Sequence, residues 1–321
     1  FAFNWAISQS FDSELLNYEK NVVYNKGKLS TTHSFVIQIN NKSGLDYADI
    51  QIEKSNFTTI DHIEGQIVNK NNEVVKKLKK KDILLLQEFE EYGFYTDFYY
   101  YNFSLLFYEF PYQIHYSYES TKTEFLTLFE WYPGLYRNIP TRNAKLSLQV
   151  PADYEIFIKE KNIQHEETTE AASGDKVYKW TESEIKPIKT ENYTNSDKSA
   201  VKNVLVYPKE FNYGIPGSYE SWQSFGDFFW QLNQGLDKLP DSEKYKVDDL
   251  LRNVSNDSVK IRLLYKYLQN ETRYVNISLG IGGLKPHPAE YVSEKKYGDS
   301  KALSNYYISL LRYAGIESNY A

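Results

Sequence analysis

The sequence predicts an α+β protein in which an antiparallel β sandwich or barrel-like domain is followed by a helical domain. Through roughly the first two hundred residues, apolar side chains recur at every second position, the spacing of strands. After Pro208 they recur at helical spacing. Tyr and Phe favour strands, and 30 Tyr and 18 Phe occur among 321 residues. We therefore expect a β-rich domain at 1–205 and a second domain at 206–321.

Five segments of the N-terminal part show the strand alternation most clearly. They are 35–40, 48–52, 112–118, 146–150 and 154–158. Asn- and Gly-containing stretches at 40–44, 69–72 and 170–175 separate such runs and predict turns. Short strands joined by turns of this kind are typical of an antiparallel sandwich or barrel.

Four segments after Pro208 have helical patterns. They are 221–231, 242–251, a segment capped by Ser255 or Asn256 and running to about 270, and 300–314. In the third, Val259, Leu263 and Tyr267 lie four residues apart and predict its apolar face. In the last, one apolar face contains Leu303, Tyr307, Leu310 and Ala314. Gly315 is a suitable C-terminal cap for this helix.

Composition and charge exclude several classes of function. A net charge of −6 does not attract nucleic acid phosphates. No apolar run reaches the ~20 residues that a membrane span needs. The absence of Cys excludes disulfides and thiolate metal sites, and the five scattered His suggest no metal site. The chain opens on Phe1, from which we expect processing after export, with a periplasmic or cell-surface location.

Two local patterns resemble ligand sites but have simpler explanations. The basic run at 76–81 lies in a strand-like context of an acidic protein, and we expect a solvated hairpin that protects a sheet edge. The glycines at 280–283 lack the spacing of a phosphate-binding loop and predict a turn. The high aromatic content fits a β scaffold, with an aromatic platform for sugar or peptide as the alternative.

The stretch 261–321 carries the most specific signal. It contains LLYKYLQNETRYVNISLGIGGLKPHPAEYV and KKYGDSKALSNYYISLLRYAGIESNYA. These about 60 residues resemble the central part of a transglutaminase-like domain of the papain-like superfamily. The whole chain resembles, more loosely, exported bacterial proteins in which such a domain follows a β-rich domain of unknown function. The resemblance implies cysteine acyl transfer, either amide hydrolysis or transamidation, with no metal or organic cofactor.

The resemblance places Ser300 at the nucleophile position, because the family has YGDCK where this chain has YGDSK. Gly298 and Asp299 would shape the turn before it, and Tyr297 and Lys301 would flank the site. In the family a Cys at a helix N-terminus is ionised, a His takes its proton, and an Asp or Asn orients that His. The resemblance puts that His and Asp downstream of this segment. A serine hydroxyl is not ionised by a helix dipole, so we expect this form to be inactive.

Three classes of function are compatible with these features. The first is an acyl-transfer domain of the cysteine-protease type in an inactive form, with a β-rich recognition domain. The second is a non-catalytic pseudoenzyme that binds a peptide or glycan, and the third is a structural envelope protein. The partners expected are a protein or peptide substrate or an envelope glycan, and not nucleic acid. Neither the substrate nor the oligomeric state follows from the sequence.

Overall fold

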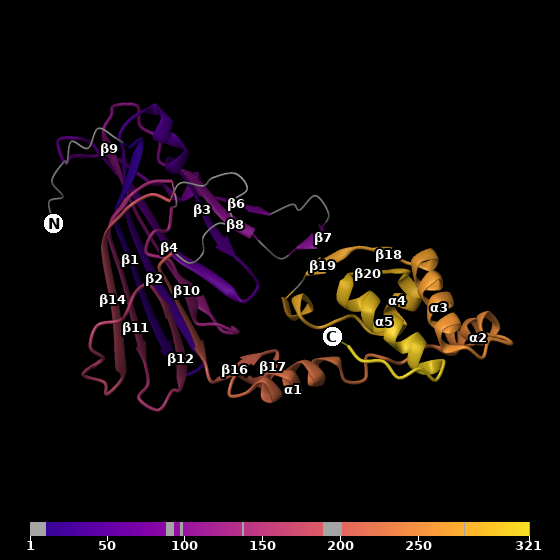
Figure 1. Ribbon diagram of the computed structural model, residues 1–321. Coiled ribbons are helices and arrows are strands. Elements are labelled where there is room, and N and C mark those ends of the chain that lie inside the picture. The colour runs from indigo at the N-terminus through magenta and orange to yellow at the C-terminus, as the bar shows by residue number, and fades with distance from the viewer. Residues whose placement is uncertain are drawn as a thin grey trace. The chain divides into compact units, whose positions relative to one another are not determined.

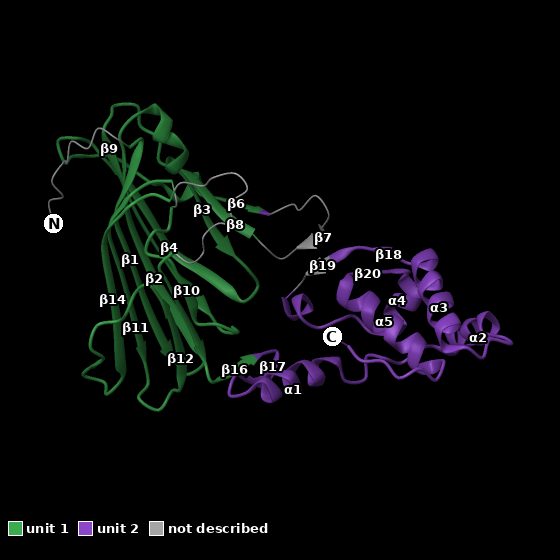
Figure 2. Cartoon of the chain, viewed as in Figure 1, with its two compact units in different colours: residues 1–86, 98–212 green, residues 87–97, 213–321 purple. Residues whose placement is uncertain are grey.

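The computed structural model describes residues 11–87, 93–96, 99–136, 138–188, 201–278 and 280–320. The chain forms two compact units (Figure 2). Unit 1 contains residues 1–86 and 98–212, and unit 2 contains residues 87–97 and 213–321. Unit 1 is almost entirely β structure and unit 2 is mainly helical, so the predicted α+β class is confirmed. The independent folding of domains 1–205 and 206–321 stays a prediction.

Unit 1 is built on one eight-stranded sheet, whose long strands run side by side in Figure 1. In order across the sheet, the strands are β13 (Thr169–Glu170), β14 (Lys176–Ile185), β11 (Thr141–Val150), β1 (Ser13–Asn25), β2 (Lys28–Ile39), β9 (Tyr112–Lys122), β4 (Thr58–Val68) and β5 (Val74–Lys77). Neighbouring strands are antiparallel except β1 and β11, which pair in parallel. The sequence did not predict this parallel pair.

Two three-stranded sheets complete unit 1. One has the order β3 (Asp49–Lys54), β8 (Tyr99–Ser104) and β6 (Leu84–Gln87), and the other β10 (Phe129–Trp131), β15 (Asn203–Pro208) and β12 (Ile156–Lys161). A single core joins Ile37 and Ile114 of the long sheet to Ile52 and Val206 of the small ones. Because the inner faces of the sheets share this core, unit 1 is a sandwich.

The turns and the basic run of unit 1 follow the sequence predictions closely. The segment after Asn41 forms a 3₁₀ helix, η1 (Lys42–Ala48), and η2 (Lys80–Asp82) follows β5. Strand β5 is at the edge of the long sheet, and all four of its residues are exposed. The lysines of 76–81 therefore begin on a solvated edge strand, which discourages pairing with a further strand.

Unit 2 contains five helices and several short strands within the described residues (Figure 1). The helices are α1 (Trp222–Asn233), α2 (Asp241–Leu250), α3 (Asp257–Glu271), α4 (Ala289–Lys295) and α5 (Ser300–Tyr313). Strand β18 (Arg273–Tyr274) pairs with β20 (Tyr297–Gly298), and β19 (Asn276–Ser278) pairs with β7 (Gly93–Thr96), both in parallel. Strand β16 (Glu210–Tyr213) crosses the boundary between the two units, and unit 2 also contains β17 (Ile215–Ser218) and the 3₁₀ turn η3 (Gly280–Gly283).

The helix starts agree with the predicted caps, and one predicted face is wrong. Asn256 caps α3, and its side-chain oxygen accepts a hydrogen bond from the N–H of Val259. Val259 itself is 42% exposed, whereas Leu264 is fully buried. The face of α3 that enters the core is therefore centred one residue beyond Leu263. Helix α4 was not predicted, because its seven residues are too few for a periodic pattern.

Candidate active site

The first turn of α5 is fixed by Asp299, which is the N-terminal capping residue. Its Oδ1 accepts a hydrogen bond from the N–H of Ala302 at 2.8 Å. Its Oδ2 pairs with the ammonium of Lys301. The Asp299 side chain is almost fully buried. Because both carboxylate oxygens are engaged, the capping side chain is held in one place, and the start of the helix is held with it.

Ser300 is the first residue of α5 and is exposed. Its hydroxyl forms no hydrogen bond with any residue that the structure describes. The N–H groups at the start of a helix have no partner within the helix, and the helix dipole puts a partial positive charge there. An atom at the Ser300 Oγ position therefore lies where negative charge is stabilised. This is the property that a thiolate nucleophile and an oxyanion both need.

Gly298 packs so tightly against α5 that no side chain fits there. A Cβ built on Gly298 would lie 2.9 Å from the Cβ of Ala302 and 3.4 Å from Cγ2 of Val292. The carbonyl oxygen of Gly298 accepts a hydrogen bond from the N–H of Val275 at 3.0 Å. The short β18–β20 pair thus holds the entry turn against the helix. A glycine at this position is a packing requirement of the turn.

Tyr297 belongs to a row of aromatic groups beside this turn. Its hydroxyl forms a hydrogen bond of 2.7 Å with the hydroxyl of Tyr291 in α4. The His287 ring stacks on Tyr291, with 4.5 Å between centroids. No described contact joins the His287 imidazole to Ser300. His287 is thus a stacking residue here and not a base for Ser300.

A buried carboxylate behind the site was missed by the sequence analysis. Glu243 of α2 is 1% exposed and accepts hydrogen bonds from Tyr267 and Tyr306, each at 2.5 Å, and from Ser293 at 2.8 Å. The ammonium of Lys296 lies 3.7 Å from its Oε2. Glu243 therefore links α2, α3, α4 and α5, and no local pattern marks it because the tyrosines and the serine that donate to it are distant in sequence.

The hydrogen bonds decide the ionisation of this cluster. Burial by itself raises the pKa of Glu243, but the hydrogen bonds from Tyr267, Tyr306 and Ser293 and the charge of Lys296 outweigh it, so the pKa is lowered. Burial and the hydrogen bond to Glu243 raise the pKa of Tyr306 and of Tyr267. The cluster is thus an ionised carboxylate with neutral phenol donors.

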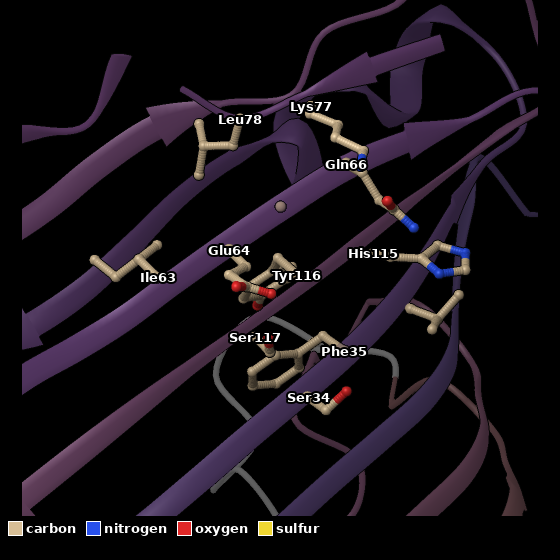
Figure 3. Close-up of a pocket in the computed structure, with 12 residues that line it drawn as sticks. Ser34, Phe35, Ile63, Glu64, Gln66, Lys77, Leu78, His115, Tyr116 and Ser117 are labelled. Carbon is tan, nitrogen blue, oxygen red and sulfur yellow. The ribbon is translucent and has the colours of Figure 1, made fainter. Parts of the chain in front are cut away.

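Unit 1 carries a cleft of about 420 Å³ on its long sheet (Figure 3). Glu64, Gln66, Lys77, His115 and Ser117 are among the residues that line it. The imidazole of His115 is hydrogen-bonded to Oε1 of Gln113 at 3.0 Å, and burial lowers its pKa. These side chains belong to neighbouring strands and do not form a nucleophile–base pair, so the cleft has no catalytic set.

No group of three or more His, Asp or Glu side chains among the described residues is arranged to hold a metal ion. None of the described helices has the length and hydropathy of a membrane span.

Comparison with known families gives a match over just over half of the chain. Residues 25–189, which lie in the β-rich part, match the model of a domain of unknown function with solved structure, DUF3857. The chain belongs to the DUF3857 family. The match accounts for the β-rich N-terminal part, and the DUF3857 model does not cover Ser300. The comparison with curated proteins gave no match.

The DUF3857 chain also has similar solved structures. A protein from Parabacteroides distasonis ATCC 8503, described as a putative protease, matches 95% of this chain with a TM-score of 0.71 and 14% identity. This chain spans 59% of that protein's length. Legionella pneumophila aminopeptidase A matches 64% of this chain over 22% of the length of the aminopeptidase chain, with a TM-score of 0.32 and 13% identity. The first similarity is one of fold, and the second is too low to support an argument.

Proposed function

We propose that unit 2 is a transglutaminase-like domain of the papain-like superfamily and that Ser300 occupies its nucleophile position. The observation that carries the proposal is the placement of Ser300. It is an exposed residue at the first position of α5, directly after a buried capping aspartate and a glycine that admits no side chain. The fold similarity to a protein described as a protease supports the same class.

In this proposal, each residue from Tyr297 to Lys301 has a role. The side chain of residue 300 would attack an amide carbonyl. The backbone N–H of the same residue would donate a hydrogen bond to the oxyanion that forms. Asp299 holds the helix start, with Lys301 holding Asp299 in turn. Gly298 allows the close entry turn. Tyr297, whose hydroxyl is hydrogen-bonded to that of Tyr291, flanks the site. The substrate class is a protein or peptide amide.

With serine at position 300, the proposed domain binds without turning over. A hydroxyl has a far higher pKa than a thiol, so the helix N-terminus does not produce an alkoxide from it. Ser300 also has no hydrogen bond to an imidazole in the part of the chain described here. The serine at the nucleophile position favours the second candidate, a non-catalytic domain that binds a peptide or glycan outside the cell. The resemblance to exported proteins supports a periplasmic or cell-surface location.

The test compares two serines on one helix. Ser300→Cys puts a thiol at the first position of α5, and Ser304→Cys puts one at an exposed position four residues further on. The effect of a helix dipole falls off within the first turn, so only the first thiol should be acidified. We expect iodoacetamide alkylation to give a pKa at least about one unit below the ~8.5 of free cysteine for Ser300→Cys, and an ordinary pKa for Ser304→Cys.

The opposite outcome is equally clear. If both thiols titrate together near ~8.5, position 300 is not an activating site, and the nucleophile assignment fails. Amidase and transamidation assays on the unmodified chain should show no turnover. Turnover by the serine form would contradict the proposed inactivity.

A further inference from the structure

Unit 1 contains a second hollow, of about 570 Å³, inside the sandwich. We call it the lysine chamber. Its walls include Lys20 and His33 of the long sheet, Lys122 and Tyr118 of β9, Tyr136, and Glu53 of β3. Glu53 is exposed, and so are two further lining residues, Gln51 and Glu130, so the chamber is open to solvent. Its volume is in the range of pockets for small organic ligands.

Three polar side chains form a row on the inner face of the sheet. Lys20 of β1 is opposite His33 of β2, which is opposite Tyr118 of β9. The His33 ring stacks on Tyr118, with centroids 4.4 Å apart. The ammonium of Lys20 lies 4.9 Å from the ring centroid of Phe129. This row interrupts a face that is otherwise core, where apolar side chains would be expected.

The positive charge of the chamber has no bonded counter-charge. Within the described residues, neither Lys20 nor Lys122 forms an ion pair or a hydrogen bond, and Nδ1 of His33 is buried without a partner. Burial and the charge of Lys122 lower the pKa of Lys20 to about 7. Burial also lowers the pKa of Lys122, although the negative charge of Glu53 opposes this. Burial and the charges of both lysines lower the pKa of His33 to about 3. Among the described residues, Lys20 has only the ring of Phe129, and Lys122 only the charge of Glu53, to offset the cost of burying an ammonium group.

We propose that the lysine chamber binds a small organic carboxylate, which pairs with Lys20 and Lys122 while its body packs on the rings of Tyr118 and Tyr136. The charge balance favours a monoanion. Two lysines line the chamber, and the carboxylate of Glu53 already acts on Lys122. Glu130 is exposed and already accepts hydrogen bonds from Tyr132 and Asn203, so the charge left to match inside is about one. The tyrosine rings provide faces for an apolar or sugar-ring body. This site lies in the DUF3857 part of the chain and does not depend on the function proposed for Ser300.

The binding test uses pairs of probes in which one member has a carboxylate where the other has a neutral group. Calorimetry on the full chain would compare N-acetylphenylalanine with its amide, and glucuronate with glucose. We expect the acid of one pair to bind at least about tenfold more tightly than its neutral partner. The pair that responds distinguishes a peptide carboxylate from a sugar acid. Equal binding of acid and neutral partner in both pairs, or no saturable binding at all, would overturn the proposal.

Variants locate the site. Lys20→Gln and Lys122→Gln should each weaken binding at least about tenfold. Lys159→Gln, which removes an exposed lysine lying 5.5 Å from the ring of Tyr207 and outside the chamber, should leave binding unchanged. Lys20→Gln should melt no lower than the parent chain, because it removes an unpaired charge. If Lys20→Gln binds as the parent does, or if inorganic phosphate displaces the acid at equal concentration, the carboxylate assignment is wrong.

Discussion

The phenolic hydroxyl of Tyr306 donates a hydrogen bond of 2.5 Å to Oε1 of Glu243, across 63 positions of sequence. Tyr267 donates to the same oxygen, and Ser293 donates to the other. Four helices therefore meet at one ionised group. A buried carboxylate is tolerated only when its lone pairs are satisfied, so the stability of unit 2 depends on this arrangement.

Replacing Glu243→Gln should lower the free energy of unfolding of unit 2 by about 2–4 kcal/mol. The amide keeps one acceptor oxygen and adds two donors among groups that are themselves donors. Denaturant unfolding followed by circular dichroism at the helical band measures the loss. Asp241→Asn, on the same helix but with a side chain that is 83% exposed, should change stability far less. Equal effects of the two changes would show that the cluster is unimportant.

The same cluster should make unit 2 sensitive to acid. The pKa of Glu243 is lowered by the hydrogen bonds and by Lys296, which outweigh burial. Its contribution to stability is therefore present above the unfolded value of about 4.3 and is lost as the pH falls through the folded value. We expect urea unfolding to show a fall in stability below about pH 4.3 that is reduced in Glu243→Gln. An identical acid slope in both proteins would contradict this assignment.

Gly298→Ala should destabilise the entry turn of α5 by about 1–3 kcal/mol, because the new methyl would lie 2.9 Å from the Cβ of Ala302. Gly226→Ala, in the open middle of α1 with nothing within 4 Å of the new methyl, should instead stabilise by up to about 1 kcal/mol. Thermal unfolding of both variants measures the difference. Stabilisation by Gly298→Ala would show that the turn does not pack as described.

Unit 1 should become more stable as the pH rises above neutrality. The folded pKa of Lys20 is lowered to about 7, whereas the unfolded lysine keeps its ordinary value. Between these values the unfolded chain binds more protons, so stability rises with pH, by at most about 1.4 kcal/mol per pH unit for one group. Urea unfolding at about pH 7 and about pH 9 should show this gain in the parent chain and less of it in Lys20→Gln. Lys159→Gln should keep the full gain.

The sequence predicts those features that depend on neighbouring residues. Alternation such as that of Phe35, Ile37 and Ile39 reveals strands, and the capping side chain at Asn256 locates the start of α3. Ser300 at the first position of α5 also follows from a local pattern. The sequence does not reveal features that depend on register or on distant partners. Glu243 and Lys20 are unremarkable in sequence, because the contacts that define them come from other elements.

The parallel pairing of β1 with β11 determines the order in which unit 1 can be completed during synthesis. Asn143 and Asn17 share a hydrogen bond of 2.7 Å, and so do Ser147 and Asn21, in each case across 126 positions. When β1 and β2 emerge from the ribosome, one side of β1 can pair at once, but its other side must wait for β11. An open strand edge is prone to pair with other chains. During that interval, the newly made sandwich is most exposed to aggregation and most dependent on chaperones.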